Sequence, residues 1–358
     1  MYRHGRPRDG LRLLIIAGLA LGLIVSEAVA AMAAAPGDWE ACTDQSGDAA
    51  IAGCTAVIGD ESEAEDRRAR AHYNRGLERQ IKGELDSAIA DYDEALRLNL
   101  RHPAVLTNRG SAYRDKGDYD RALADHNEAI EVDPSYVKAY NNRGNVHDAM
   151  GDHAAAVADY TKAIELNPDY VSAYFNRGIS HGRARDHASA AADFSTAIKL
   201  KPDYVEAYVS RANAYDGLDD FDAAIADYTT AIALRPEAAT SYNKRGRAYM
   251  DRGDSEDHDL AIADFTKAIE LDPELADAYY NRGFLYTYNV ADGDWMRSIA
   301  DLTKTIELKP DYAEAYFNRG AAYSAMKDKD NAIADFKKAD ALGYPNAEKA
   351  LRKLGAEP

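Results

Sequence analysis

Apolar residues recur at three- and four-residue steps through most of the chain, in stretches of about one helix that are separated by short polar turns. In one such pair, Val105, Ala112 and Tyr113 fall on one side of a helix, and after a polar turn Ala122 and Ala129 continue the pattern. This period is typical of amphipathic α-helices. The pattern therefore predicts helices joined in pairs.

Proline marks the end of the second helix in these pairs. Pro134 restricts the residue before it and lacks an amide hydrogen, so a helix cannot continue through it. A proline occupies the same place in five later pairs: Pro168, Pro202, Pro236, Pro273 and Pro310. The chain is therefore predicted to be all-α.

The same unit is repeated along the chain. An Arg followed by a small residue recurs in the first helix of eight units at steps of 34 residues, with two later steps of 37: Arg75, Arg109, Arg143, Arg177, Arg211, Arg245, Arg282 and Arg319. Three extra residues near 255–257 and three near 290–292 lengthen two turns and leave the helices intact. A helix pair of this size cannot bury its apolar face alone, so neighbouring units must stack.

Small and aromatic residues alternate at fixed offsets within each unit. The place of Gly110 and those of Ala122 and Ala129 hold small residues throughout, which permits close helix packing, while aromatic residues such as Tyr160 fill the space between. This arrangement over 69–344 resembles the tetratricopeptide repeat, although Arg rather than Leu precedes the glycine. The resemblance implies a right-handed α-solenoid of eight 34-residue helix-turn-helix repeats with a concave groove formed by the first helices.

The two ends of the chain differ from the repeats. Four arginines precede an apolar run at 13–25 and a small-residue stretch, which is typical of a secretory signal at 1–33. The protein is therefore expected to be exported to the periplasm or secreted; an uncleaved signal that anchors it to the membrane is the alternative. Residues 34–68 are interpreted as an N-terminal cap or degenerate repeat, and 345–358 as a C-terminal capping helix and tail.

Two cysteines, Cys42 and Cys54, lie close together in the predicted cap. An even pair in an oxidising compartment favours a disulfide that staples the cap. Metal binding is the weaker interpretation, because two thiolates supply only half of a zinc site and no histidine lies within 36–66.

Charge and motifs narrow the function further. The formal net charge of −18 disfavours nucleic acid as a partner, and no membrane insertion is expected beyond the signal segment. Seven of the nine histidines occupy aromatic packing positions of the repeat, as His126 does at the position of Tyr160. No phosphate-binding loop, nucleophile elbow or zinc-protease motif is present. The sequence predicts neither a cofactor nor a metal site and no enzymatic activity.

The repeated arginines are matched by an aspartate at one offset in each second helix. The expected ion pairs join first to second helices, within or between units, and include Arg109, Arg143 and Arg177 with Asp125, Asp159 and Asp193.

A repeated asparagine is the candidate ligand-binding feature. It directly precedes the arginine in six units, as Asn74, Asn108, Asn142, Asn176, Asn281 and Asn318. In tetratricopeptide proteins this position points into the concave groove, and an amide can both donate to and accept from a peptide backbone. The alternative is that these asparagines only solvate a helix or repeat by duplication. Lys138, Tyr280 and Phe317 are also predicted to lie in the groove.

Together these features predict a non-enzymatic scaffold that binds an extended segment of another protein or peptide. The alternative hypothesis is a self-assembling structural protein, a homo-oligomer in which the groove has no ligand.

Overall fold

The computed structural model describes residues 35, 37–254, 256–288 and 294–357, and within these ranges all regular secondary structure is helical. The chain divides into two compact units of several repeats each, the first ending at Gly151 and the second beginning at Asp152. From here on the word unit refers to these two parts, and a single repeat is called a pair of helices. The expected signal at 1–33 and the inserted residues 255 and 290–292 lie outside the described residues.

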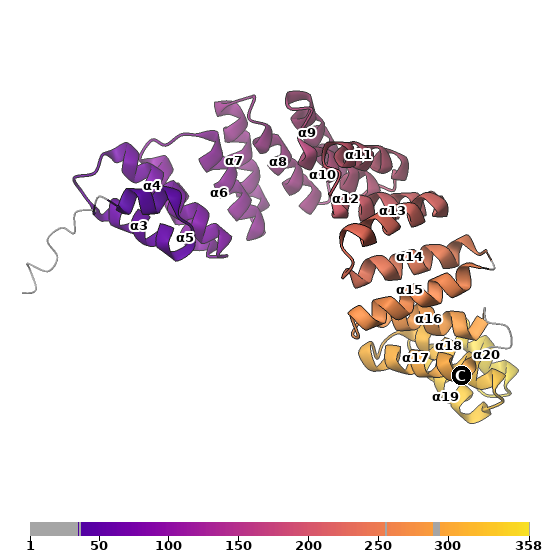
Figure 1. The fold of residues 1–358 in the computed structure, drawn as a ribbon. Helices are drawn as coiled ribbons and strands as arrows, with labels where there is room; N and C mark the ends of the chain where they lie inside the picture. Colours follow the sequence, from indigo (N-terminus) through magenta and orange to yellow (C-terminus); the bar gives the residue numbers. More distant parts are fainter. Residues whose placement is uncertain (1–34, 36, 255, 289–293, 358) are drawn as a thin grey trace, which may run out of the picture. The chain divides into compact units, whose positions relative to one another are not determined.

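Nineteen helices occupy the described ranges and follow one another in antiparallel pairs (Figure 1). They are α2 (Asp38–Asp44), α3 (Gly47–Gly59), α4 (Glu65–Ile81), α5 (Leu85–Arg97), α6 (Pro103–Asp115), α7 (Tyr119–Val132) and α8 (Val137–Ala149) in the first unit, and α9 (His153–Leu166), α10 (Val171–Arg183), α11 (His187–Leu200), α12 (Val205–Asp216), α13 (Phe221–Leu234), α14 (Ala239–Arg252), α15 (Asp257–Leu271), α16 (Ala276–Tyr288), α17 (Trp295–Leu308), α18 (Ala313–Ala325), α19 (Lys329–Ala341) and α20 (Ala347–Lys353) in the second.

Helices that are adjacent in the chain pack against each other in each unit, as in an α-solenoid. The first helices of neighbouring pairs also touch: α4 contacts α2 and α6, α6 contacts α8, α10 contacts α12, and α16 contacts α14 and α18. Each unit therefore has a face made mostly of first helices, which is called the first-helix face below.

Most second helices begin at a capping aspartate, and those followed by a proline end before it, as the sequence predicts. The Asp118 carboxylate accepts a hydrogen bond from the Arg121 N–H at 3.1 Å, and an aspartate caps α9, α11, α13, α17 and α19 in the same way. Gly117, just before the first of these caps, has a φ of 81°, which glycine adopts without steric cost. The helix α7 ends at Val132, two residues before Pro134.

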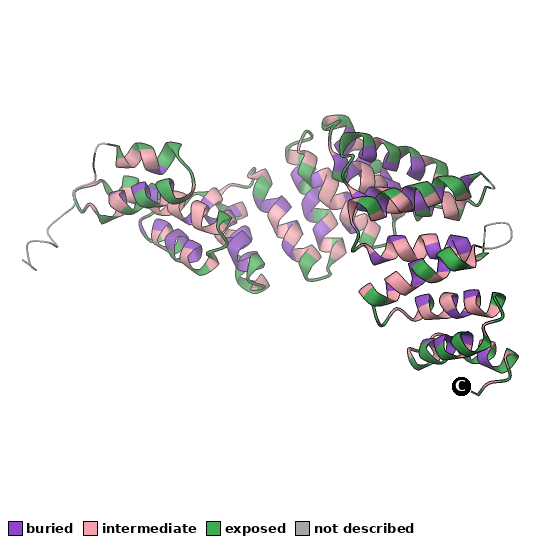
Figure 2. Ribbon diagram, turned by 60° about the horizontal axis from the view of Figure 1, so that its bottom comes forward, coloured by how far each residue is buried: buried purple, intermediate pink, exposed green. Residues whose placement is uncertain are grey.

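The core lies where a large ring of a second helix covers a glycine of the first. A Cβ atom added at Gly178 would lie 2.7 Å from Phe194 Cε1, and Gly76 has the same relation to Tyr92. The small position predicted from the repeats is therefore required by close packing. Figure 2 shows buried residues on the sides of helices that face their neighbours, and exposed residues on the outer sides and in the turns.

Both ends continue the stacking. In the first unit α2 and α3 form a pair that packs on α4, and a disulfide joins Cys42 to Cys54, as expected. In the second unit α20 packs on α19, with Leu351 buried against Phe336.

Candidate functional site

The arginine that precedes the glycine holds its own second helix. Arg177 Nε and Nη2 donate to the two carboxylate oxygens of Asp193 at 2.8 and 2.7 Å. Arg109 binds Asp125 in the same bidentate way, at 2.8 and 2.6 Å. These two expected pairs are present in the structure. Arg143 lies in the first of the two compact units and Asp159 in the second, so their pairing stays a prediction.

Each of these arginines also reaches the second helix of the preceding pair. The third nitrogen of Arg177, Nη1, donates to Thr161 Oγ1 at 2.9 Å. Equivalent bonds join Arg75 to Thr55, Arg109 to Asp93, Arg143 to Asn127, Arg211 to Ser195, Arg245 to Thr229, Arg282 to Thr266 and Arg319 to Thr303. Sequence reasoning missed this acceptor, although a residue able to accept recurs two positions after every aspartate of the series except the last, Asp335. Each arginine thus links its own first helix to the second helix of its own pair and to that of the preceding pair, which is a structural role.

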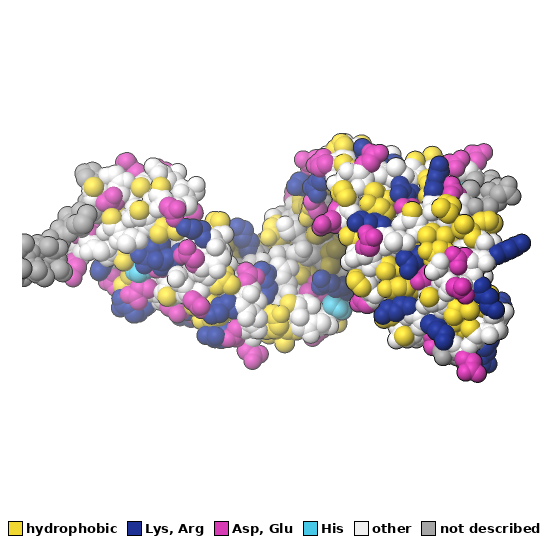
Figure 3. Space-filling view, turned by 90° about the horizontal axis from the view of Figure 1, so that it is seen from below, with side chains coloured by type: hydrophobic (Ala, Val, Ile, Leu, Met, Phe, Trp, Pro, Cys, Tyr) yellow, Lys and Arg dark blue, Asp and Glu magenta, His cyan; other side chains and the backbone are white. Residues whose placement is uncertain are grey.

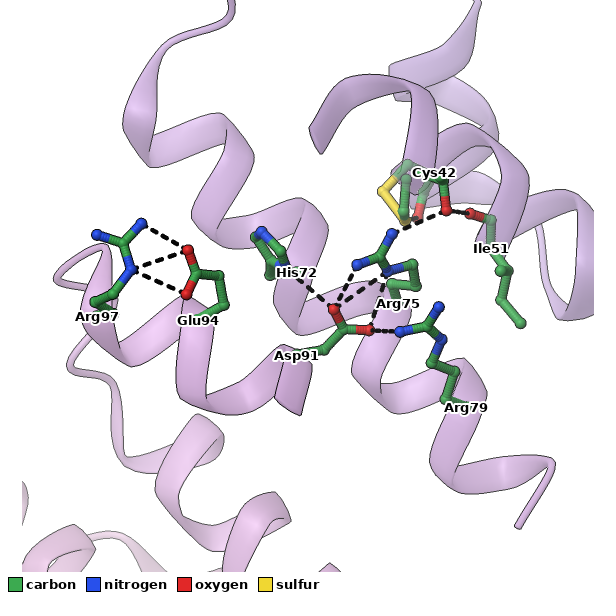
Figure 4. Close-up of polar contacts among 10 residues, drawn as sticks. Cys42, Ile51, His72, Arg75, Arg79, Asp91, Glu94 and Arg97 are labelled. Atoms are coloured by element: carbon green, nitrogen blue, oxygen red, sulfur yellow. Dashed lines mark hydrogen bonds and ion pairs between the residues drawn. A yellow bond between two sulfur atoms is a disulfide. The ribbon is translucent and has the colours of Figure 1, made fainter. Parts of the chain in front are cut away.

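Asp91 receives hydrogen bonds from two arginines, Arg75 and Arg79, and contacts His72 (Figure 4). Arg75 and Arg79 both donate to it at 2.7 Å, and His72 Nδ1 lies 3.0 Å from it. Burial pushes the pKa of Asp91 upward, but hydrogen bonds from His72 and Arg75 and the charge of Arg79 outweigh it, so the pKa lies below its ordinary value. With its carboxylate buried and fully engaged, Asp91 acts as an anchor between helices.

The repeated asparagines do more than solvate the first-helix face. Asn108 Nδ2 donates to the Tyr73 hydroxyl at 3.0 Å, and Asn74 Nδ2 donates to the Cys42 carbonyl at 3.4 Å. In the second unit Asn281 Nδ2 donates to Asn243 Oδ1 at 3.1 Å. In each case the acceptor belongs to the preceding first helix. Among the described residues, the Oδ1 atoms of these three asparagines receive no hydrogen bond.

The other asparagines differ from this arrangement. Asn142 donates to Ser111 Oγ at 3.1 Å and accepts from Asn141 at the same distance. Asn318 is only 4% exposed, donates to the Tyr280 hydroxyl and accepts from the Tyr288 hydroxyl. The prediction that Asn318 faces a ligand is therefore wrong, because its amide is buried and used at both ends.

Asn176 is half-buried on α10. Its position in the groove stays a prediction.

The three further residues predicted to lie in the groove have different surroundings. Lys138 is exposed on α8. Phe317 packs between Phe336 and Tyr344, with ring centroids 5.3 and 4.5 Å away, so much of its surface is used in packing.

Tyr280 belongs to an aromatic row on the second unit. Its ring stacks on Tyr312 at 4.7 Å, and the row continues along α16 through Phe284 to Tyr288, which is 48% exposed. Burial raises the pKa of Tyr280 to about 12. Figure 3 shows hydrophobic side chains gathered on one face of this unit, interrupted by charged ones.

A pocket of about 430 Å³ opens on the first unit among α2, α4 and the start of α6. Its lining residues are Trp39, Thr43, Arg70, Tyr73, Asn74, Leu100, His102, Ala104 and Val105. Two of the side chains that hydrogen-bond along the first-helix face, Tyr73 and Asn74, thus also line a cavity. Sequence reasoning missed Trp39 and His102, because the short helix α2 and the loop before α6 do not follow the repeat alignment.

Comparison with known families identifies the repeats. Profiles described as TPR repeat match residues 110–151, 217–253 and 254–287, and profiles described as tetratricopeptide repeat match 137–170, 69–102 and 313–342. Together these matches cover more than half of the chain. The chain belongs to the tetratricopeptide repeat family. Proteins of this family are generally non-enzymatic scaffolds, and the repeats support a role for this TPR protein in binding other proteins.

Two solved structures agree with the fold, and a third, MamA, is similar in sequence. The C-terminal part of a TPR repeat-containing protein from Cytophaga hutchinsonii is 16% identical with a TM-score of 0.58, covering 71% of this chain and 98% of that one. PilF of Pseudomonas aeruginosa is 17% identical with a TM-score of 0.52, covering 60% and 96%. MamA is 27% identical with a TM-score of 0.44, covering 47% and 96%. No curated protein matches the TPR chain. Among its described helices, none has both the length and the apolar character needed to cross a membrane.

Proposed function

We propose that this TPR protein binds an extended segment of another protein along the first-helix face of its units. The observation that carries the proposal is the state of Asn74, Asn108 and Asn281. Each side-chain amide is oriented by a hydrogen bond to the preceding first helix, and its Oδ1 atom is left to accept. A peptide backbone offers N–H donors at regular spacing, so oriented acceptors on successive helices can bind it with little regard for its sequence.

The proposal predicts a specific effect of replacing these amides. Peptides would first be selected by display of a random library against the purified protein, and their affinity measured by calorimetry. Replacing Asn74, Asn108 and Asn281 with Ala should weaken binding by about two- to tenfold for each amide that the peptide contacts, because a hydrogen bond contributes about 0.5–1.5 kcal/mol. The same substitutions also remove hydrogen bonds between first helices, so some loss of stability is expected.

A matched control separates these two effects. Thr229→Val and Thr266→Val each remove a bond between neighbouring pairs on the second-helix side, where Arg245 and Arg282 donate. These variants should lose stability and keep their affinity for the selected peptides. If no peptide is enriched, or if the asparagine variants bind as well as the parent, the first-helix face is not the binding surface. A stable oligomer by light scattering in that case would favour self-assembly.

We also propose that the protein works outside the cytoplasm. The signal-like pattern at 1–33 and the disulfide between Cys42 and Cys54 support this location, since disulfides persist in oxidising compartments. Intact mass of the protein from its native cells should correspond to a chain starting near Ala31 or Ala34, whose thiols resist alkylation until they are reduced. A full-length mass with two reactive thiols would contradict export.

A further inference from the structure

The pocket on the first unit has the composition of a side-chain binding site. We propose that it receives a bulky apolar side chain of the bound segment, and that Arg70 binds a carboxylate on the next residue of that segment. This inference rests on the proposed function, since it names the kind of segment that the first-helix face selects.

The volume of the pocket and its apolar lining suit one apolar side chain with its backbone. The volume of about 430 Å³ is at the lower end of the ~300–1,000 Å³ typical of ligand sites. Five of its nine lining residues are Trp39, Tyr73, Leu100, Ala104 and Val105. Transfer of an aromatic or branched side chain from water onto these groups is favourable.

The walls of the pocket are held in place before any ligand arrives. Tyr73 accepts the hydrogen bond from Asn108 and packs with its ring centroid 6.1 Å from that of Tyr92. The Arg67 guanidinium lies over the Trp39 ring at 5.0 Å from its centroid. The disulfide joins α2, which carries Trp39, to α3. A rigid site loses little conformational entropy on binding, which favours affinity.

The polar groups of the pocket favour an anion. Arg70 and His102 line it, and no Asp or Glu does, although the chain as a whole carries −18. His102 Nδ1 accepts from the Ala104 N–H at 3.1 Å, which places the proton of the neutral ring on Nε2 as a donor. Within the described part of the chain Arg70 is bound only to Asp66, at 3.1 Å, and both side chains are more than half exposed. Such a surface pair is weak, so a ligand carboxylate can compete for the guanidinium.

Trp39 reports directly on this pocket. The chain has two tryptophans, so Trp295→Phe leaves Trp39 as the single tryptophan in the full-length protein, whose emission is excited selectively over that of the tyrosines at the red edge of the absorption band. The probe is an acetylated and amidated hexapeptide with Phe followed by Glu at its centre and Ser and Thr elsewhere. It should change the Trp39 emission saturably, and its Phe→Ala form should bind roughly tenfold to a hundredfold more weakly. The Glu→Gln form should bind two- to fivefold more weakly, and Arg70→Ala should abolish that difference.

A blocking variant keeps the test independent of Arg70. Ala104→Leu places a larger side chain in the pocket and should weaken probe binding tenfold or more. Ser172→Leu introduces the same residue at the equivalent position of α10 and should leave probe binding unchanged. An absent Trp39 response at millimolar probe, or unchanged binding by Ala104→Leu, overturns the pocket. Equal binding of the Glu and Gln probes to the parent overturns the role of Arg70. If display-selected peptides still depend on the asparagines in these cases, the proposed function stands without this pocket.

Discussion

His126 is a buried imidazole whose replacement should change the response of the first unit to pH. The side chain is 0% exposed, neither ring nitrogen has a hydrogen bond among the described residues, and a Cβ atom at Gly110 would lie 2.8 Å from its Cε1. Burial lowers the pKa of His126 to about 3, and the charges of Arg114 and Arg143 act in the same direction.

The sign of the effect follows from the lowered pKa. The folded protein keeps the ring neutral, whereas the unfolded chain can protonate it. The resulting loss of folding free energy is absent above the unfolded pKa of about 6.5 and grows as the pH falls toward 3. At about 1.36 kcal/mol per unit, this penalty reaches about 2 kcal/mol at pH 5. In a later repeat the position equivalent to His126 is held by Phe194, which packs against Gly178. His126→Phe should therefore stabilise the region by about 1–3 kcal/mol at pH 7.5, because it removes buried polar atoms without partners, and by about 2 kcal/mol more at pH 5.

Hydrogen exchange measured by mass spectrometry on peptides of α6 and α7, at pH 7.5 and 5, would give the local opening free energies. Other titrating groups, including Asp125, are common to both proteins, so the difference between variant and parent isolates His126. Peptides of α13, which carries Tyr228 at the same repeat position, provide the internal control. If the stability of parent and variant falls equally between the two pH values, the buried neutral imidazole is not the cause.

Three further predictions follow from particular contacts. Arg177→Ala and Asp193→Ala should each destabilise the second unit, and a double-mutant cycle by urea denaturation should give a coupling energy of about 0.5–3 kcal/mol; additive effects would exclude the bidentate pair. Gly178→Ala should cost about 1–3 kcal/mol in the same assay because its Cβ would overlap Phe194, whereas Gly182→Ala in the same helix has open space and should stabilise by up to about 1 kcal/mol; the reverse order would contradict the packing. Reduction of Cys42–Cys54 should lower the opening free energy of α2 and α3 by about 3 kcal/mol for a loop of 12 residues, with exchange in α9–α19 unchanged; protection that is unaltered in α2 would show that packing alone holds it.

The sequence by itself determined the local structure and the repeat. Helix period, aspartate caps and prolines act over a few residues, so the ends of α7 and its relatives could be predicted without any knowledge of the fold. That arginines such as Arg109 pair with an aspartate of a second helix was also accessible, because both recur regularly in the repeat. The regularity allowed pairing within or between repeats, and the structure selected Asp125 for Arg109. The small residue at Gly178 followed from the same regularity.

Only the tertiary structure decided what happens between neighbouring pairs. The partner of an Asn amide depends on which side chain the preceding first helix offers: Tyr73 for Asn108, Ser111 for Asn142, and two tyrosines that bury Asn318. Stacking also decides which residues line a pocket, because Trp39 and Tyr73 line the same pocket only through the packing of α2 on α4. The sequence pattern is nearly the same in every repeat, whereas these contacts depend on the few side chains that differ between neighbouring repeats. The energy of each contact also depends on how deeply its atoms are buried, which the pattern does not show.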